Sequence, residues 1–346
     1  MDPDLLLAGL TGGDTAALAR AISVVENGRP GFERLLDGVH PRLGRARRIG
    51  ITGPPGAGKS TLLEHLVTAY RTAGQRVAVI AVDPTSPFTG GALLGDRIRM
   101  ESVALDPGVF IRSMGSRGSL GGLATTTREV CDLLDAAGFD RILVETVGVG
   151  QSELDVARMA DSTVLVLVPE SGDGIQTLKS GVMEIADLFV VNKADRPGAD
   201  KLRHEVEVTL GIRRGNAFRH VPAHHGWRAE RRTTAPREDG TRVAAWMPPV
   251  LLATAARGEG IGELVAALDR HHDWLVASGT LEERRRSRLL DRTREVVDRA
   301  TRRWVWEESR ADERIAERLG EIAAGRVSPY EVAAGVLDEL KQGERT

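Results

Sequence analysis

Short apolar runs alternate with helical segments along the middle of the chain, and this alternation restricts the fold more than any other feature. The runs are almost continuously apolar, which indicates strands that are buried on both faces. Parallel strands joined by helices give such a sheet. We therefore expect an α/β fold with a mostly parallel central sheet flanked by helices, with ligands bound at the carboxyl ends of the strands. The runs lie at about 48–52, 76–82, 141–144, 163–168, 188–191 and 249–253.

Composition excludes several classes of protein. The 346 residues include 41% apolar and 28% charged residues, as in an ordinary globular protein. A net charge of −2 argues against a dedicated nucleic-acid-binding protein. A single cysteine, Cys131, excludes an intrachain disulfide and a metal site built from several thiolates. No apolar run approaches the roughly 20 residues that span a bilayer, and the acidic N-terminal segment does not match a signal peptide. We therefore expect a cytoplasmic protein with no membrane partner.

A glycine-rich segment directly follows the first apolar run and precedes an amphipathic helix. It matches G-x-x-x-x-G-K-[ST], the P-loop, whose backbone N–H groups surround phosphate oxygens at a helix N-terminus. Lys59 is expected to reach the β- and γ-phosphates, and the Ser60 hydroxyl to coordinate Mg²⁺. The alternative is a glycine-rich turn with a surface lysine. The predicted nucleotide-binding residues here are Gly53, Pro54, Pro55, Gly56, Ala57, Gly58, Lys59, Ser60 and Thr61.

Two further strand ends predict which base is bound. In the segment Asn192-Lys193-Ala194-Asp195, the aspartate can accept hydrogen bonds from N1–H and the exocyclic amine of guanine. Adenine lacks this pair of donors, and a site that leaves its carboxylate unpaired rejects the wrong ligand by roughly 10⁴-fold. Lys193 would lie along the base. The pair Thr254-Ala255 is placed to contact the guanine oxygen through a backbone N–H. The sequence thus favours GTP over ATP.

Acidic residues at strand ends are candidates for the metal site and for sensing the γ-phosphate. Glu145 ends the run RILV and can hold Mg²⁺ through water, while the N–H of Gly148 can bond the γ-phosphate. Glu145 could instead cap a helix or pair with a cation. Asp83 ends the run VAVIAV and could alternatively belong to a turn. The predicted residues of the metal site are Ser60, Asp83, Asp96 and Glu145.

Five strings occur in an order and spacing that extend beyond a generic P-loop: GPPGAGKST, VDPTSPFTGGALLGDRIRM, FDRILVETVGVGQSE, GDGIQTLKSG and NKAD. Over about residues 15–275 the chain closely resembles the MeaB/ArgK-like family. These GTPases chaperone adenosylcobalamin-dependent methylmalonyl-CoA mutase, and the human methylmalonic aciduria type A protein belongs with them.

The resemblance implies a Mg²⁺-dependent, homodimeric GTPase that binds GTP and GDP. It would bind methylmalonyl-CoA mutase or a related acyl-CoA mutase, gate cofactor loading, and protect and reactivate the mutase. The family also has a mobile segment that couples nucleotide to partner, which would lie here at about 170–181. Asp173 and Lys179 would enter the site from this segment, although Lys179 could instead be an exposed helix lysine. The implied catalytic residues are Lys59, Asp83, Glu145 and Lys179.

The P-loop GTPase domain is expected over residues 45–278, between two helical regions. The N-terminal region, 1–44, has helical spacing over 3–27. The C-terminal arm, 279–346, contains a long charged helix at about 281–324 and a final capped helix. Such an arm can mediate dimerisation or pack on its own domain, and the pattern alone leaves both alternatives open.

Other activities also remain open. A nickel-inserting GTPase generally carries Cys-x-x-Cys, Cys-His pairs or a histidine-rich tail. Here Cys131 is alone, and the doublets His224-His225 and His271-His272 are interpreted as surface pairs. An ATP-dependent kinase, including the arginine/ornithine transport kinase as which some family members were labelled, conflicts with Asp195. A nucleotide-dependent scaffold without enzymatic activity would not hydrolyse GTP.

Overall fold

The computed structural model describes residues 2–83, 100–115, 122–146, 152–169, 182–213 and 244–343. The chain divides into two compact units, Met1–Arg288 and Leu289–Thr346. The first unit contains the sheet and the N-terminal helices, and the second is built from helices in its described part.

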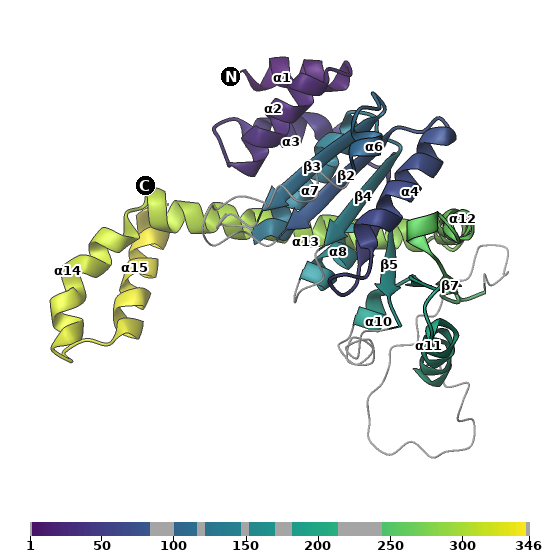
Figure 1. Ribbon diagram of the computed structural model, residues 1–346. Coiled ribbons are helices and arrows are strands. Elements are labelled where there is room, and N and C mark those ends of the chain that lie inside the picture. Colours follow the sequence, from purple (N-terminus) through teal and green to yellow (C-terminus); the bar gives the residue numbers. More distant parts are fainter. Residues whose placement is uncertain are drawn as a thin grey trace, which may run out of the picture. The chain divides into compact units, whose positions relative to one another are not determined.

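A seven-stranded sheet with the order β3-β2-β4-β1-β5-β6-β7 forms the centre of the first unit (Figure 1). All neighbouring strands are parallel, which confirms the predicted α/β architecture. Each predicted apolar run lies in or overlaps a strand. The strands are β1 (Arg47–Thr52), β2 (Val77–Asp83), β3 (Val109–Gly115), β4 (Arg141–Thr146), β5 (Ser162–Leu167), β6 (Leu188–Val191) and β7 (Val250–Leu252).

Strand β3 was not predicted from the sequence. Arg112 and Ser113 interrupt its apolar pattern, and the strand pairs only with β2 because it lies at the edge of the sheet. An edge strand is less completely covered than a central one, so its sequence need not be continuously apolar.

Helices cover both faces of the sheet. Along β2, Val77 and Val79 pack with α4 on one face, while Ala78 and Ile80 pack with α7 on the other. This alternation explains why the central strands are apolar at every position. The helices on the α4 face are α4 (Lys59–Thr72), α6 (Glu101–Ala104) and α12 (Ile261–Ala277), and those on the α7 face are α7 (Gly122–Ala136), α8 (Ser152–Met159), α10 (Val182–Ile185) and α11 (Ala199–Arg213).

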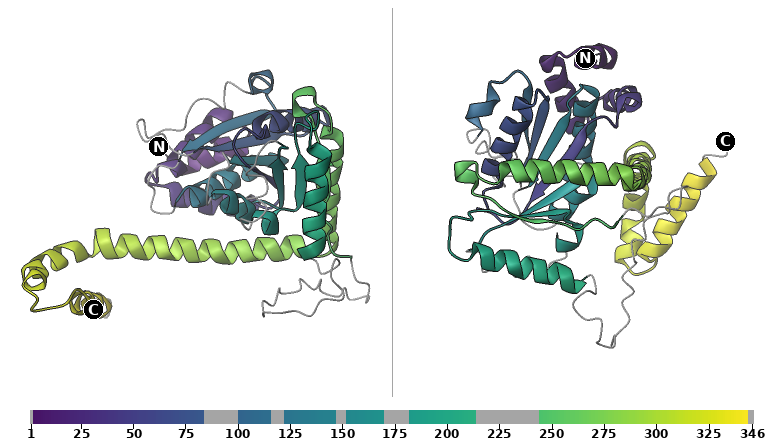
Figure 2. Two further views of the ribbon diagram at one scale, coloured as in Figure 1. Left: turned by 60° about the horizontal axis from the view of Figure 1, so that its bottom comes forward. Right: turned by 90° about the vertical axis from the view of Figure 1, so that its right-hand side faces the viewer.

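The N-terminal region contains three short helices that pack against α7: α1 (Pro3–Thr11), α2 (Thr15–Glu26) and α3 (Phe32–Val39). The single stretch of helical spacing expected over 3–27 is therefore divided into two helices. The break falls at Gly12 and Gly13, and Gly13 has a φ of 88°, which a helix cannot accommodate. Figure 2 shows the N-terminal helices and α11 at opposite ends of the sheet.

The start of α13 (Thr280–Arg303) is fixed to the first unit by buried ion pairs. Arg288 bonds Asp161 at 2.5 Å, and Arg284 bonds Asp187 at 2.8 Å. Asp161 and Asp187 precede β5 and β6, so the first turns of the helix, up to Arg288, lie at the amino ends of the strands, opposite the edge that carries the P-loop. Burial alone would raise the pKa of the Asp161 carboxyl, but Arg288 and Arg285 hold that pKa well below its usual value.

The interpretation of His271 as a surface residue is wrong, because its side chain is completely buried. Its Nδ1 lies 2.8 Å from the Ser162 hydroxyl, and its Nε2 lies 3.4 Å from Asp187 Oδ1. The rings of Trp246 and Trp274 pack against the imidazole. Burial lowers the pKa of His271 to about 4, so the neutral imidazole is the form that the fold accommodates.

The second unit begins within α13 and continues through a π-helical turn (Trp304–Glu308), α14 (Ala311–Ala323) and α15 (Pro329–Gly343). The uninterrupted helix expected over 281–324 is wrong, because Arg310 has a left-handed φ of 55° and separates the π-helical turn from α14. The final helix begins as predicted, with Pro329 in its first turn and a bond from the Glu331 N–H to Ser328 Oγ. Ala311, Val332, Val336 and Leu340 form a small core.

The first unit also contains the short 3₁₀ turns His40–Arg42 and Ala255–Arg257. Of the helices that the structure describes, none has both the length and the apolar character required to cross a membrane.

Candidate functional site

The P-loop connects the end of β1 to α4 through two positions that require glycine. Gly53 has a φ of 140°, and a Cβ there would lie 2.1 Å from the carbonyl oxygen of Val166. Gly58 has a φ of 83°, and a Cβ there would lie 2.4 Å from Asn192 Nδ2. Both glycines are therefore needed for the backbone to turn close to its neighbours.

Lys59 begins α4, and its side chain lies almost completely buried, at 5% exposure. Its ammonium group donates hydrogen bonds to the carbonyl oxygens of Gly53, at 2.8 Å, and Pro54, at 3.0 Å. The positive charge is thus held by the loop that the sequence predicts to surround phosphates. A surface lysine, the alternative interpretation, is excluded for this residue.

Ser60 lies in the first turn of α4, and its hydroxyl donates a 2.8 Å hydrogen bond to Glu145 Oε1. Glu145 lies on β4, next to β1 in the sheet, and is 7% exposed. Magnesium prefers oxygen ligands and usually takes only one or two carboxylates from the protein. A hydroxyl and a carboxylate brought together at the carboxyl edge of the sheet fit this requirement.

Asp83 is the last residue of β2, which neighbours β4. Val82 lies opposite Thr146 in this pair, so the backbones of Asp83 and Glu145 reach the same edge of the sheet. The structure thus brings two of the predicted metal-site residues to neighbouring strand ends.

Asn192 follows β6 and connects the P-loop to the segment after β7. Its Nδ2 donates to the carbonyl oxygen of Ala57 at 2.8 Å, and its Oδ1 accepts from the N–H of Ala255 at 3.0 Å. With 2% exposure, its amide has both bonds in a buried setting, where losing either one is costly. Lys193 follows with a φ of 58°, which turns the chain so that Asp195 reaches a cavity.

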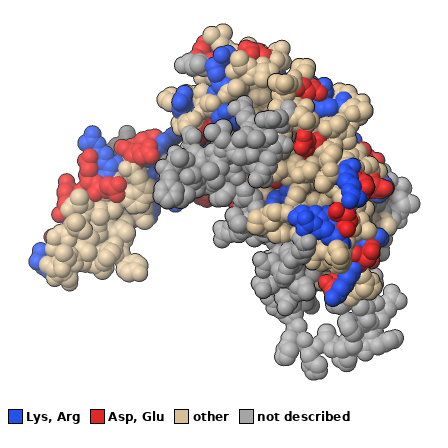
Figure 3. All heavy atoms as spheres, in the orientation of Figure 1, with Lys and Arg blue, Asp and Glu red and all other residues tan. Residues whose placement is uncertain are grey.

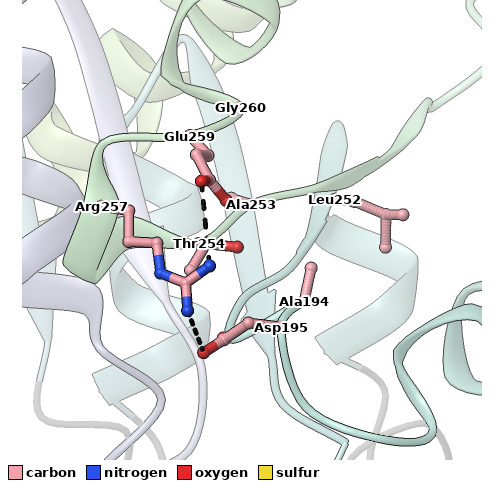
Figure 4. Close-up of a pocket in the computed structure, with 8 residues that line it drawn as sticks. All are labelled: Ala194, Asp195, Leu252, Ala253, Thr254, Arg257, Glu259 and Gly260. Atoms are coloured by element: carbon pink, nitrogen blue, oxygen red, sulfur yellow. Dashed lines mark ion pairs between the residues drawn. The ribbon is translucent and has the colours of Figure 1, made fainter.

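The cavity beside Asp195 has a volume of about 280 Å³ (Figure 4). The Asp195 carboxylate lies 3.8 Å from the Arg257 guanidinium, which also lies 4.0 Å from Glu259. Arg257 and Glu259 were not predicted from the sequence, although both closely follow the predicted pair Thr254-Ala255. The lining residues are Ala194, Asp195, Leu252, Ala253, Thr254, Arg257, Glu259 and Gly260.

The N–H groups of Thr254 and Ala255 already have acceptors within the protein. Thr254 donates to the carbonyl oxygen of Glu259 at 3.1 Å, and Ala255 donates to Asn192. A hydrogen bond from either N–H to a guanine oxygen would therefore be shared with these acceptors. Thr254 lines the cavity, whereas Ala255 helps to position Asn192.

Four predicted site residues, Asp96, Gly148, Asp173 and Lys179, lie outside the described residues, as does the doublet His224-His225. The side chain of Asp83 is likewise not described.

A parallel sheet with a P-loop between its central strand β1 and α4 defines the class of P-loop NTPases. Within this class, the family model described as "Methylmalonyl Co-A mutase-associated GTPase MeaB" matches residues 18–310. The chain belongs to this family of GTPases, as the resemblance of its motifs predicted.

Individual relatives agree with this assignment. A putative GTPase of Pyrococcus abyssi is 43% identical over 98% of this chain and 97% of its own length. The mitochondrial methylmalonic aciduria type A homolog of Mus musculus is 36% identical over 82% of this chain and 66% of its own. A crystal structure titled LAO/AO transport system kinase is similar with a TM-score of 0.66 and 29% identity, over 98% of this chain and 97% of its own.

Proposed function

We propose that this protein is a Mg²⁺-dependent GTPase that chaperones methylmalonyl-CoA mutase or a related acyl-CoA mutase. In this role it gates cofactor loading and protects and reactivates the mutase. The proposal that this protein binds GTP rests on the two hydrogen bonds of the Asn192 side chain. They join Ala57 of the P-loop to Ala255, which follows Thr254 in the lining of the cavity beside Asp195. One amide thus relates the phosphate end of the site to its base end.

Lys59 and the loop around it supply the phosphate end of the proposed site. The ammonium that now bonds the carbonyl oxygens of Gly53 and Pro54 would instead contact the β- and γ-phosphates of GTP. Water attacks the γ-phosphorus, the bond to the β-phosphate oxygen breaks, and GDP and phosphate leave. Lys59 stabilises the negative charge that develops on the transferred group and on the leaving GDP.

The proposed metal site uses the oxygen atoms of Ser60 and Glu145, with Asp83 and Asp96 nearby. When bound there, Mg²⁺ would neutralise part of the negative charge on the β- and γ-phosphates. Ser60 and Glu145 would then exchange their mutual hydrogen bond for positions around the ion. The Gly148 N–H is proposed to bond the γ-phosphate and to release it after hydrolysis.

The cavity beside Asp195 is proposed to hold guanine. The Asp195 carboxylate is 36% exposed and faces this cavity, so it can reach the N1–H and the exocyclic amine of the base. Lys193 would lie along the base, as predicted from the sequence. Arg257 pairs with Asp195 at 3.8 Å and would balance its charge until the two guanine donors replace it.

The mutase partner is proposed from the name of the family and of the mouse relative. The segment 170–181, with Asp173 and Lys179, is proposed to couple nucleotide state to mutase binding. Gating of this kind requires that the mutase binds the GTP state and the GDP state with different affinities.

Calorimetry of the mutase with this protein tests the proposed gating. The protein is loaded either with a non-hydrolysable GTP analogue or with GDP, both with Mg²⁺. We expect tighter binding in the GTP-like state. Equal affinity in the two states contradicts gating, and absence of binding in both contradicts the choice of this mutase.

We also propose that the second unit mediates homodimerisation. Its own core is small, whereas several large apolar side chains on it are exposed. A small unit with so little buried surface gains stability by covering such side chains with a second copy. Figure 3 shows a broad face of α14 and α15 that is largely free of charged side chains. The exposed residues are Leu289, Leu290, Val296, Val297, Trp306, Leu319, Tyr330 and Leu337.

A further inference from the structure

A second cavity, of about 460 Å³, lies between α2, the turn after it and edge strand β3. It is at the opposite end of the sheet from β7 and the cavity beside Asp195, so the nucleotide site does not account for it. Three of its lining side chains are arginines. The lining residues are Ala19, Arg20, Ser23, Val24, Arg29, Pro30 and Arg112.

Arg112 occupies a position that normally carries an apolar side chain. It lies on the same face of β3 as Phe110 and Met114, which both pack in the core under the N-terminal helices. Its guanidinium bonds the Glu26 carboxylate through Nε, at 3.3 Å, and through Nη2. Within the described residues no partner engages Nη1, so one donor group of this arginine is available to a ligand.

The other two arginines leave the cavity with an excess of positive charge. Arg20 is paired with Asp14 at 3.8 Å, with both side chains about half exposed. Arg29 lines the cavity, and the part of the chain that the structure describes provides no carboxylate within 4.0 Å of it. Among the described residues, the carboxylates of Asp14 and Glu26 pair with Arg20 and Arg112, and the charge of Arg29 then leaves a net charge of about +1.

Apolar atoms complete the lining. Ala19 and Val24 contribute methyl groups from one face of α2, and Pro30 contributes its ring. An inward-facing arginine on an edge strand can simply discourage pairing with other strands. That role requires neither a cavity of this size nor two further arginines around it.

We propose that this cavity binds a small organic anion in which a carboxylate or a phosphate is attached to a short apolar group. The anionic group would contact Arg29 and Nη1 of Arg112, and the apolar group would lie on Ala19, Val24 and Pro30. Guanidinium groups suit this function because their planar donors match both carboxylate and phosphate oxygens.

Isothermal titration calorimetry with hexyl phosphate and with hexanoate tests this proposal. The full-length protein is saturated with GDP and Mg²⁺ so that the P-loop is occupied, and the titrations are repeated with Lys59→Ala to exclude residual binding at the P-loop. We expect one saturable site for at least one of the two anions, and comparing them tells phosphate from carboxylate. Hexanol, which lacks the charge, should bind at least about tenfold more weakly.

Variants locate the site. Arg29→Ala should weaken binding by about tenfold or more, because a charge-assisted hydrogen bond is lost, and Arg112→Ala should do the same. Glu26→Gln should leave binding equal or make it tighter, since a competing carboxylate is removed. Arg34→Ala is the matched control, because Arg34 is exposed on α3, pairs with Asp4 and does not line the cavity.

Three results would overturn the proposal: no saturable binding of either anion, equal binding of hexanol, or unchanged binding by Arg29→Ala. Arg29 is exposed, so its replacement should not disturb folding, and unchanged circular dichroism would verify this. The outcome does not depend on GTP hydrolysis, so it is separate from the test of the proposed function.

Discussion

The Ser60 hydroxyl donates a 2.8 Å hydrogen bond to Glu145 Oε1, which joins the first turn of α4 to β4. This bond places a hydroxyl and a buried carboxylate at the carboxyl edge of the sheet before any ion is bound. A carboxylate that already has a donor is less costly to bury than an isolated one. The pair therefore keeps the proposed metal site assembled in the absence of Mg²⁺.

We predict that Ser60→Ala weakens GDP binding in Mg²⁺ by at least about tenfold, because a metal ligand is lost. In EDTA the variant and the original protein should bind GDP with similar affinity. Fluorescence titration with a labelled GDP in the two buffers measures both values. The control is Thr68→Ala, an exposed threonine of α4 that bonds the carbonyl oxygen of Glu64. An equal loss in EDTA would show that Ser60 acts on the loop rather than on the ion.

We predict that Asp195→Asn lowers the affinity for GTP by about 100-fold or more, because an amide cannot accept from both guanine donors. The same variant should gain affinity for xanthosine triphosphate, since the amide N–H₂ can donate to the oxygen that replaces the exocyclic amine of guanine. Competition against labelled GDP measures both nucleotides. Asp200→Asn, an exposed aspartate in the first turn of α11, is the control. Unchanged nucleotide selectivity in Asp195→Asn would show that guanine does not bind in the cavity beside this residue.

We predict that acid destabilises the protein between pH 6.5 and pH 4 through His271. Its pKa falls from 6.5 in the unfolded chain to about 4 in the fold, because burial lowers it more than Asp187 raises it. The unfolded state therefore takes up a proton first, and stability is full above pH 6.5 and decreases as pH falls. The loss over this range is about 3 kcal/mol.

Urea unfolding at a series of pH values measures this loss. In His271→Gln the decrease between pH 6.5 and pH 4 should largely disappear, while His40→Gln, at an exposed histidine, should keep it. Asp161 contributes a further loss below about pH 3.8, because its pKa is held down by Arg288 and Arg285 despite burial. An unchanged profile in His271→Gln would assign the acid sensitivity to other groups.

We predict that Val297→Glu combined with Leu319→Glu separates the proposed homodimer into monomers, because charges then face an apolar interface. Both side chains are more than half exposed in the single chain, at 56% and 58%. Light scattering coupled to size-exclusion chromatography should show the mass halved. Leu105→Glu, at a 92% exposed leucine of the first unit, is the control. A monomeric original protein would contradict the proposed homodimer.

Local sequence patterns predicted the parts of the fold and site that depend on neighbouring residues. The P-loop, the apolar strands beside it and the position of Glu145 at the end of β4 follow from short strings. Strand β3 was missed because Arg112 and Ser113 break its pattern at the sheet edge. The break at Arg310 was also missed, because arginine normally favours helix and its left-handed φ is set by the surrounding structure.

Contacts between distant segments could not be predicted from pattern. His271 reads as half of an exposed doublet, but it contacts Ser162, which begins β5 and lies 109 positions earlier, and Asp187, which directly precedes β6. One of the two hydrogen bonds of the Asn192 side chain likewise joins it to Ala57, 135 positions away. Arg257 lies two residues past a predicted segment, yet only folding brings it to Asp195.

Hydrolysis of GTP and of ATP by the purified protein, alone and with methylmalonyl-CoA mutase from the same source, tests both the guanine specificity and the coupling to the mutase. We expect slow hydrolysis of GTP, no hydrolysis of ATP, and an increase in the GTP rate when the mutase is added. An increase absent in Lys59→Ala would locate the activity at the P-loop. Preferred hydrolysis of ATP, or a GTP rate that the mutase leaves unchanged, would contradict the proposed function.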